Sequence, residues 1–140
     1  LNEAIHFRLK ASMREHILDQ LVDLSVIADI VLIDGDKNLS FLLEILFVFE
    51  TRLPERLNFI SLGIGRENLD EVILQTHALK SASSALGMRQ LGFMCDEIVA
   101  LSRRSDFETA QQMLDKVSSN GVESLNFIRS WCVENDFRST

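Results

Sequence analysis

The chain has 140 residues, of which 46% are hydrophobic and 25% are charged, and its formal net charge is -7. This length suits one domain with one hydrophobic core, and the composition is that of an ordinary globular protein. The net negative charge argues against binding to nucleic acid or to an anionic membrane, because both require a basic surface. No run of roughly eighteen apolar residues is present, so we expect no insertion into a membrane.

The cysteines and histidines indicate neither a disulfide framework nor a metal site. Cys95 and Cys132 lie far apart without a C-x-x-C pattern, which favours two reduced core thiols in a cytoplasmic protein. The spacing of His6, His16 and His77 does not match that of metal ligands, so we expect no zinc and no other cofactor on this chain. The opening residues, LNEAIHFRLK, do not resemble a signal peptide. Because the first residue is Leu rather than Met, we leave open that the chain is part of a longer protein.

Apolar residues recur with a period of about 3.6 along most of the chain, and the alternation typical of strands is never sustained, so we predict an all-α protein. The first predicted helix covers about 2–33, with a break near Ser25 as an alternative, and the loop at 34–37 ends it. We expect this N-terminal extension, residues 1–37, to cap the rest of the fold. A role in dimerisation and the end of a linker are the alternatives.

The second predicted helix starts at an N-cap on Asn38 or Ser40 and ends at about Ser61. Pro54 is expected to kink it or to open a new segment, because proline lacks the N–H group and clashes with the preceding turn. A turn is then expected at 63–65, where two glycines lie.

The third predicted helix begins after Asn68, which forms a capping-box pattern with Glu71, and it ends near Gly87. The fourth predicted helix covers about 88–104. These connections are short, and short connections favour antiparallel neighbours.

The fifth predicted helix starts at a second capping-box candidate, Ser105 with Glu108. Apolar spacing carries it through Gly121, although a break at Asn120-Gly121 is the alternative. We therefore predict an antiparallel four-helix bundle over 38–140, with an additional N-terminal helix, as one globular unit.

The third predicted helix contains the stretch THALKSASSALG, residues 76–87, and carries a polar stripe. At about 100° per residue, Ser84, Ser81 and Lys80 fall within roughly 20°, 40° and 60° of His77. The opposite side is apolar and is expected to be buried; it carries Val72, Leu79, Ala82 and Leu86. His77 should therefore point outward, near the middle of the solvent face.

Ile73 and Leu74 lie on either side of His77, and apolar residues beside an exposed polar stripe suit a docking surface. An exposed imidazole is a good nucleophile near neutral pH. Lys80 can offset the charge of a phosphoryl group, and nearby serine hydroxyls can donate hydrogen bonds to its oxygens. No carboxylate follows His77 and nothing resembles an oxyanion hole, so a hydrolase is not indicated. From this spacing alone, an ordinary surface histidine is an equal alternative.

The motif His-Ala-Leu-Lys-Ser-Ala-Ser at 77–83, with Gly87, Leu91 and Cys95 downstream, resembles the signature of the histidine-containing phosphotransfer (HPt) domain of multistep phosphorelays. The segment LSFLLEILFVFETRLPERLNFI resembles the second helix of that family, including its proline. The resemblance covers about 38–133 and is more specific than the His-x-x-Lys pair alone.

The resemblance implies a four-helix bundle with a phosphorylatable histidine and without an ATP site or kinase activity of its own. It implies that His77 accepts a phosphoryl group, through Nε2, from the aspartate of a receiver domain and passes it to the aspartate of another receiver. Lys80 would assist with phosphoryl charge, and Ser84, with Ser81, would donate hydrogen bonds. The implied partners are response-regulator receiver domains or a hybrid sensor kinase, and Mg²⁺ would be bound by the receiver only.

Two positions depart from the family pattern. Ser81 stands where glycine usually follows the lysine, and Val99 stands where some members have a glutamine that orients the histidine. Two other functions remain open: the phosphoacceptor domain of a chemotaxis-type histidine kinase, and a helical adapter that binds receivers without being phosphorylated. The sequence also leaves open whether the chain is a free protein or the tail of a hybrid kinase.

Overall fold

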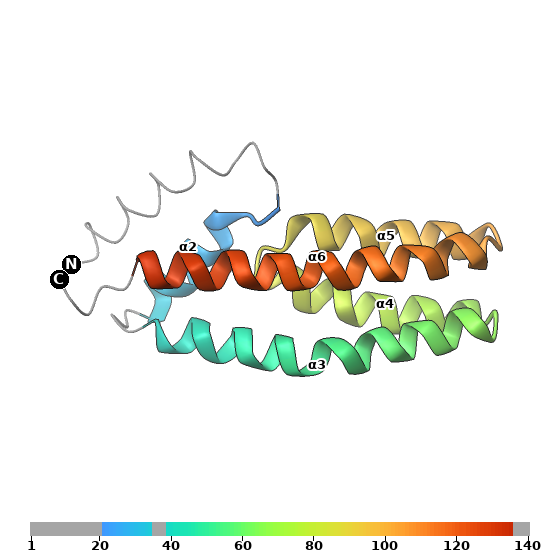
Figure 1. Ribbon diagram of the computed structural model, residues 1–140, viewed down its shortest axis with the longest axis horizontal. Coiled ribbons are helices and arrows are strands. Elements are labelled where there is room, and N and C mark those ends of the chain that lie inside the picture. The colour runs from blue at the N-terminus through green and yellow to red at the C-terminus, as the bar shows by residue number, and fades with distance from the viewer. Residues whose placement is uncertain (1–20, 35–38, 136–140) are drawn as a thin grey trace.

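The computed structural model describes residues 21–34 and 39–135, and all regular secondary structure in these two ranges is helical (Figure 1). The four long helices are α3 (Ser40–Gly65), α4 (Leu69–Ser84), α5 (Arg89–Arg103) and α6 (Phe107–Glu134). Each packs antiparallel against the next along the chain, and α6 returns to pack against α3. The predicted fold, an antiparallel four-helix bundle with an additional N-terminal helix, is confirmed.

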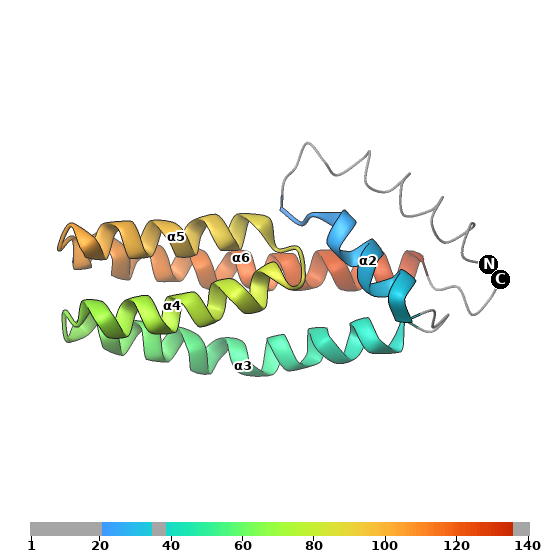
Figure 2. The same cartoon turned by 180° about the vertical axis from the view of Figure 1, so that it is seen from behind.

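The additional helix, α2 (Leu24–Asp34), crosses the end of the bundle where α3 and α6 extend beyond the other two helices (Figures 1 and 2). Its apolar side chains Leu24, Ile27 and Val31 are buried in the same core cluster as those of the four long helices. α2 therefore closes one end of the core, and the capping role predicted for the whole extension, residues 1–37, stays a prediction. The loop was predicted to begin at Asp34, but Asp34 is the last residue of α2. Residues 1–20 of the predicted extension and residues 35–37 of the predicted loop lie outside the described residues.

The prediction of one helix over 2–33 is wrong at residues 21–23, which are not helical. The Oδ1 atom of Asp23 accepts a hydrogen bond from the backbone N–H of Ser25 at 3.0 Å, and the N–H of Asp23 donates to the carbonyl of Gly87 at 2.6 Å. A carboxylate that satisfies a backbone N–H at the start of a helix favours a new helix at that point. The alternative break near Ser25 is therefore the better prediction.

α3 is one helix of 26 residues that contains Pro54, so the alternative of a new segment at the proline is wrong. Proline leaves the carbonyl of Glu50 without its helical N–H donor, and α3 changes direction near its middle (Figure 2). The N-cap position is Leu39, with a φ of 56° and no side-chain cap. Of the two predicted caps, Ser40 is instead the first helical residue, and Asn38 lies outside the described residues.

The end of α3 also differs from the prediction: the helix continues to Gly65 rather than to Ser61, so the turn expected at Gly63 and Gly65 is wrong. Gly63 stays helical at a close contact between helices, where a Cβ atom would lie 3.2 Å from Cγ2 of Val72 in α4. The chain turns only after Gly65, where Glu67 takes a φ of 53°.

α4 begins as predicted, with Asn68 as its N-cap: the Oδ1 atom accepts a hydrogen bond from the N–H of Glu71 at 3.2 Å. The reciprocal half of the capping box does not form, because the N–H of Asn68 donates to the carbonyl of Gly63 at 3.0 Å. The turn after α4 closes at Gly87, which has a φ of 68°. A Cβ atom there would lie 2.5 Å from the carbonyl oxygen of Asp23, so only glycine fits this turn.

The last two helices follow the predictions closely, and α5 agrees with the expected range 88–104 to within one residue at each end. The N-cap of α6 is Asp106, whose carboxylate accepts a hydrogen bond from the N–H of Thr109 at 3.2 Å. Ser105 takes a φ of 61° in the preceding turn, so its predicted capping role is wrong by one position. α6 continues through Gly121, so the alternative of a break there is also wrong.

The side of α4 that was predicted to be buried faces the core. Val72, Leu79 and Leu86 are buried, and Ala82 is partly buried against the same cluster. Because this side is enclosed by the bundle, the opposite side of α4 faces solvent along the middle of the helix.

Candidate functional site

His77 lies in the middle of α4, and its side chain is exposed. Ser81 and Ser84, one and two turns further along the same side of the helix, are exposed as well. His6 and His16 lie outside the described residues, so His77 is the one histidine of the described part of the chain. The polar stripe predicted from the helical spacing is therefore present on the surface.

Lys80 is tied to the neighbouring helix by an ion pair. Its Nζ atom lies 2.7 Å from Oδ1 of Asp96 in α5, and the two side chains are 37% and 54% exposed. Asp96 was not among the site residues predicted from the sequence. A signal was available, because Lys80 and Asp96 lie equally far from Met88 in the α4–α5 turn, and such positions meet in an antiparallel helix pair.

A hollow of about 200 Å³ opens beside Lys80, between α4 and α5. Ser84 and Asp96 line it, together with Arg89 and Phe93. The guanidinium carbon of Arg89 lies 5.9 Å from the centre of the Phe93 ring, and both side chains are exposed. The lining thus combines a hydroxyl, two cations, one carboxylate and one aromatic ring, on the α5 side of the polar stripe.

His77 does not line this hollow; it stands on the open surface of the helix. A nucleophile without surrounding walls cannot enclose a small substrate or exclude water by itself. It is well placed, however, to enter an active site that belongs to another protein. The arrangement therefore suits a group transfer between two proteins better than hydrolysis within this one.

Apolar side chains flank the stripe on both α4 and α3. Leu74 is 63% exposed and Ile73 is half-buried, one turn before His77. On α3, Phe59 and Leu62 are exposed. They belong to the stretch of α3 that lies along this part of α4, as the close contact between Gly63 and Val72 shows. The apolar surface beside His77 thus extends across two helices.

Arg56 of α3 reaches the backbone beside His77. Its Nη1 atom donates a hydrogen bond to the carbonyl of Ala78 at 3.4 Å. This contact places a second positive charge near the histidine, on the side opposite to Lys80. Arg56 was not predicted from the sequence, because only the pairing of α3 with α4 brings it to this position.

The two departures from the family pattern can now be placed in the fold. Ser81 is exposed, one turn from His77, so its hydroxyl is accessible to a partner. Val99 lies on α5, three residues beyond Asp96, and is half-buried. The Lys80–Asp96 contact sets α4 and α5 in a register that brings Val99 level with His77, where valine offers no hydrogen bond to the ring.

The two cysteines are buried free thiols, as predicted. Burial raises the pKa of Cys95 to about 12, an effect that Asp96 increases and Lys80 opposes. Burial likewise raises the pKa of Cys132 to about 11. A thiol that stays protonated is a poor nucleophile and a poor metal ligand, so these residues serve the core.

Within residues 21–34 and 39–135, no group of three or more histidine, cysteine or acidic residues is arranged to hold a metal ion. Over the same ranges, no helix is both long enough and apolar enough to cross a membrane.

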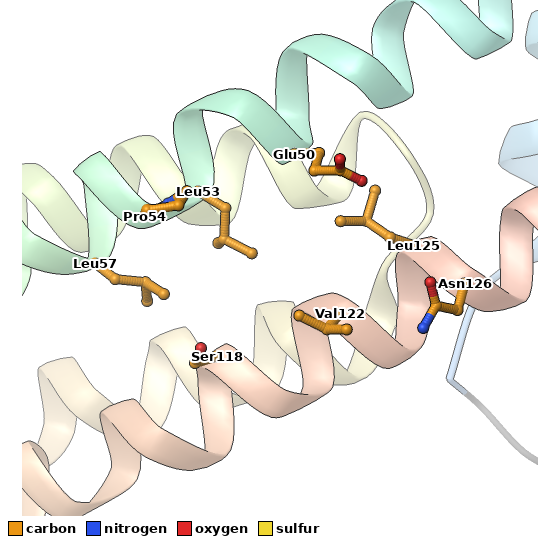
Figure 3. Close-up of a pocket in the computed structure, with 8 residues that line it drawn as sticks. All are labelled: Glu50, Leu53, Pro54, Leu57, Ser118, Val122, Leu125 and Asn126. Carbon is orange, nitrogen blue, oxygen red and sulfur yellow. The ribbon is translucent and has the colours of Figure 1, made fainter.

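A second hollow, of about 410 Å³, lies between α3 and α6 (Figure 3). Leu53, Pro54 and Leu57 line it from α3, and Val122 and Leu125 line it from α6. Its polar lining residues are Glu50, Ser118 and Asn126. The carboxylate of Glu50 is paired with Arg129, and neither a histidine nor a cysteine is among the described residues that line this hollow.

The structure displays a histidine on the surface of an antiparallel four-helix bundle, with a lysine one turn further on, as the resemblance to the phosphotransfer family implies. The family model of the Hpt domain matches residues 44–126, which is more than half of the chain, and the chain belongs to the Hpt domain family.

A relative from the fungus Candida albicans (strain SC5314 / ATCC MYA-2876), called phosphorelay intermediate protein YPD1, is 27% identical over 106 residues. The match covers 76% of this chain and 56% of that protein, so this chain spans little more than half of the relative's length. No solved structure matches the sequence significantly.

Proposed function

We propose that this chain is a histidine phosphotransfer protein of a phosphorelay, in which His77 accepts a phosphoryl group from one receiver aspartate and passes it to another. The observation that carries the proposal is the exposure of His77 in the middle of α4, in a chain of the Hpt family. The name of the Candida relative, a phosphorelay intermediate, supports the same role here.

In the first transfer, the lone pair on Nε2 of His77 attacks the phosphorus of an aspartyl phosphate. The N–P bond forms as the P–O bond to the aspartate breaks, and the aspartate leaves as a carboxylate. The second transfer reverses these bond changes on another receiver. Such a reaction depends mainly on positioning and on neutralisation of charge, and the receiver brings its own Mg²⁺ and acidic pocket. This chain need only present the nucleophile and complementary groups.

The remaining groups of the site receive supporting roles. The ammonium of Lys80 offsets negative charge on the phosphoryl oxygens, and the hydroxyls of Ser81 and Ser84 donate hydrogen bonds to them. Ile73 and Leu74 provide apolar area on which a receiver docks. Their positions around an exposed histidine support these roles.

The test uses a receiver domain phosphorylated with labelled phosphate as the only phosphoryl donor. We expect label to move to this protein and to be stable in alkali but lost in acid, as phosphohistidine is. The matched variant is His77→Gln, which keeps a side chain of similar size on an exposed site and should take up no label. If His77→Gln takes up label at the wild-type rate, the assignment of His77 is wrong.

The same experiment separates the two other functions that the sequence left open. Labelling by ATP with a partner kinase, without uptake from any phosphorylated receiver, would indicate the phosphoacceptor domain of a chemotaxis-type kinase. Binding of receivers without labelling from either source would indicate a helical adapter.

A further inference from the structure

Of the ion pairs among the described residues, the one that Asp96 forms includes a proposed site residue, Lys80. It approaches Lys80 from the neighbouring helix at 2.7 Å, a distance typical of a strong hydrogen bond between charged groups. We propose that Asp96 is a positioning residue: it holds the ammonium of Lys80 beside α5 and weakens the hold of Lys80 on a phosphoryl group at His77. The inference rests on the proposed phosphotransfer function.

Asp96 is expected to contribute little to the folding stability of the bundle. Its side chain is 54% exposed and that of Lys80 is 37% exposed, and ion pairs in such surroundings contribute little to folding stability. A long lysine side chain on a helix surface samples many rotamers unless a partner holds it. The contact with Asp96 restricts Lys80 to the α5 side of the stripe, next to the hollow that Ser84 also lines.

The charges of Asp96 and Lys80 determine whether Asp96 favours or disfavours a phosphoryl group on His77. A lysine ammonium has three N–H donors, and Asp96 takes one, so donors remain for phosphoryl oxygens. The carboxylate also opposes the positive field that Lys80 presents to a phosphoryl group. Asp96 therefore disfavours the phosphohistidine state, which keeps the phosphoryl group available for onward transfer.

The experiment measures the equilibrium between a phosphorylated receiver and the phosphorylated form of this protein. Asp96→Asn keeps the size of the side chain and removes its charge. We expect the equilibrium to shift toward phosphohistidine by about threefold to tenfold, the effect of one nearby charge in a largely solvated setting. Asp96→Glu keeps the charge and should restore a value close to that of the wild type.

Two controls tie this shift to Lys80. In a Lys80→Ala background, Asp96→Asn should shift the equilibrium much less, because the ammonium on which the carboxylate acts is gone. Glu50→Gln removes a carboxylate of the same kind from the Glu50–Arg129 ion pair on the α3–α6 side, and it should leave the equilibrium unchanged. Circular dichroism of each variant checks that the bundle is intact.

The outcomes distinguish this inference from the proposed function. If the wild-type protein exchanges phosphoryl groups with the receiver and Asp96→Asn leaves the equilibrium where it was, the role of Asp96 is wrong and the proposed function stands. The role is also wrong if Asp96→Asn acts equally in both backgrounds. If the wild-type protein takes up no phosphoryl group from any donor, both proposals fail.

Discussion

The α4–α5 side and the α3–α6 side of the bundle carry ion pairs of the same kind in different surroundings. Lys80 and Asp96 are 37% and 54% exposed, and Arg129 and Glu50 are 38% and 48% exposed. Exposure alone therefore predicts a similar, small contribution to stability from each pair. Their neighbours differ: the first pair adjoins an exposed histidine, and the second adjoins an apolar hollow around a proline (Figure 3).

This difference separates stability from function within one fold. The α3–α6 side holds its helices together and offers apolar area without a nucleophile. The α4–α5 side uses comparable packing to present the imidazole of His77, the ammonium of Lys80 and two serine hydroxyls together. A substitution on one side can thus serve as the control for its counterpart on the other.

The largest difference between the two sides should appear on removal of the cations. Lys80→Ala should slow phosphoryl transfer from a receiver by roughly a hundredfold, the usual loss when one group that stabilises developing negative charge is removed. Arg129→Ala should leave the transfer rate unchanged. Both variants should lose at most about 1 kcal/mol of unfolding free energy in urea. Equal rate losses in the two variants would remove the functional distinction between the two sides.

A smaller effect, on stability, is expected at the turn that positions α5 against α4. Gly87→Ala should lower the free energy of unfolding by about 2 kcal/mol, because a left-handed residue is strained and the new Cβ would meet the carbonyl of Asp23. Gly65→Ala, at the end of α3, is the matched control, since nothing lies within 4 Å of a Cβ atom there. Urea denaturation that gave the same loss for both variants would contradict this account of the turn.

Exposed apolar residues on the two sides provide a third comparison. Leu74 is 63% exposed beside His77, and Val122 is 50% exposed beside the α3–α6 hollow. Leu74→Ser should weaken receiver binding about fivefold, because it removes about 1 kcal/mol of apolar burial from the docked complex. Val122→Ser should leave the dissociation constant unchanged. Isothermal titration with an unphosphorylated receiver measures both, and weaker binding only in Val122→Ser would place docking on the other side.

The last comparison is confined to alkaline pH and concerns the buried thiols, one on each side of the core. Because the folded-state pKa of Cys95 is raised from 9.0 to about 12, the folded chain keeps the thiol proton where the unfolded chain loses it. Its contribution to stability is therefore complete below about pH 9 and is lost as the pH rises toward 12. The contribution of Cys132, whose pKa is about 11, should likewise be lost as the pH rises. The fall in unfolding free energy above pH 9 should be shallower in Cys95→Ala; an identical slope would argue against this titration.

Features that depend on the residues of a single helix are predicted well from the sequence. The exposed stripe of His77, Ser81 and Ser84 follows from the spacing of residues along α4, and so does the buried side with Val72 and Leu79. The fold class follows from the same periodicity, since each of the four long helices buries one side.

The errors concern features that depend on pairing between helices or on the backbone of a turn. Gly63 reads as a turn residue in isolation, but contact with Val72 keeps it in α3. Asp96 and Arg56 meet α4 only through the antiparallel register, so the periodicity of α4 could not reveal them. Ser105 and Asp106 were both chemically suited to cap α6, and the backbone of the turn decided in favour of Asp106.

The central claim is that the phosphoryl group is carried by His77, and the most direct measurement locates that group. After phosphorylation by a receiver, NMR correlation of the ring nitrogens with phosphorus identifies which imidazole is modified and at which nitrogen. The account predicts one phosphorylated ring, that of His77, modified at Nε2. Phosphate found on His6, on His16 or on a carboxylate, with the ring of His77 unmodified, would contradict it.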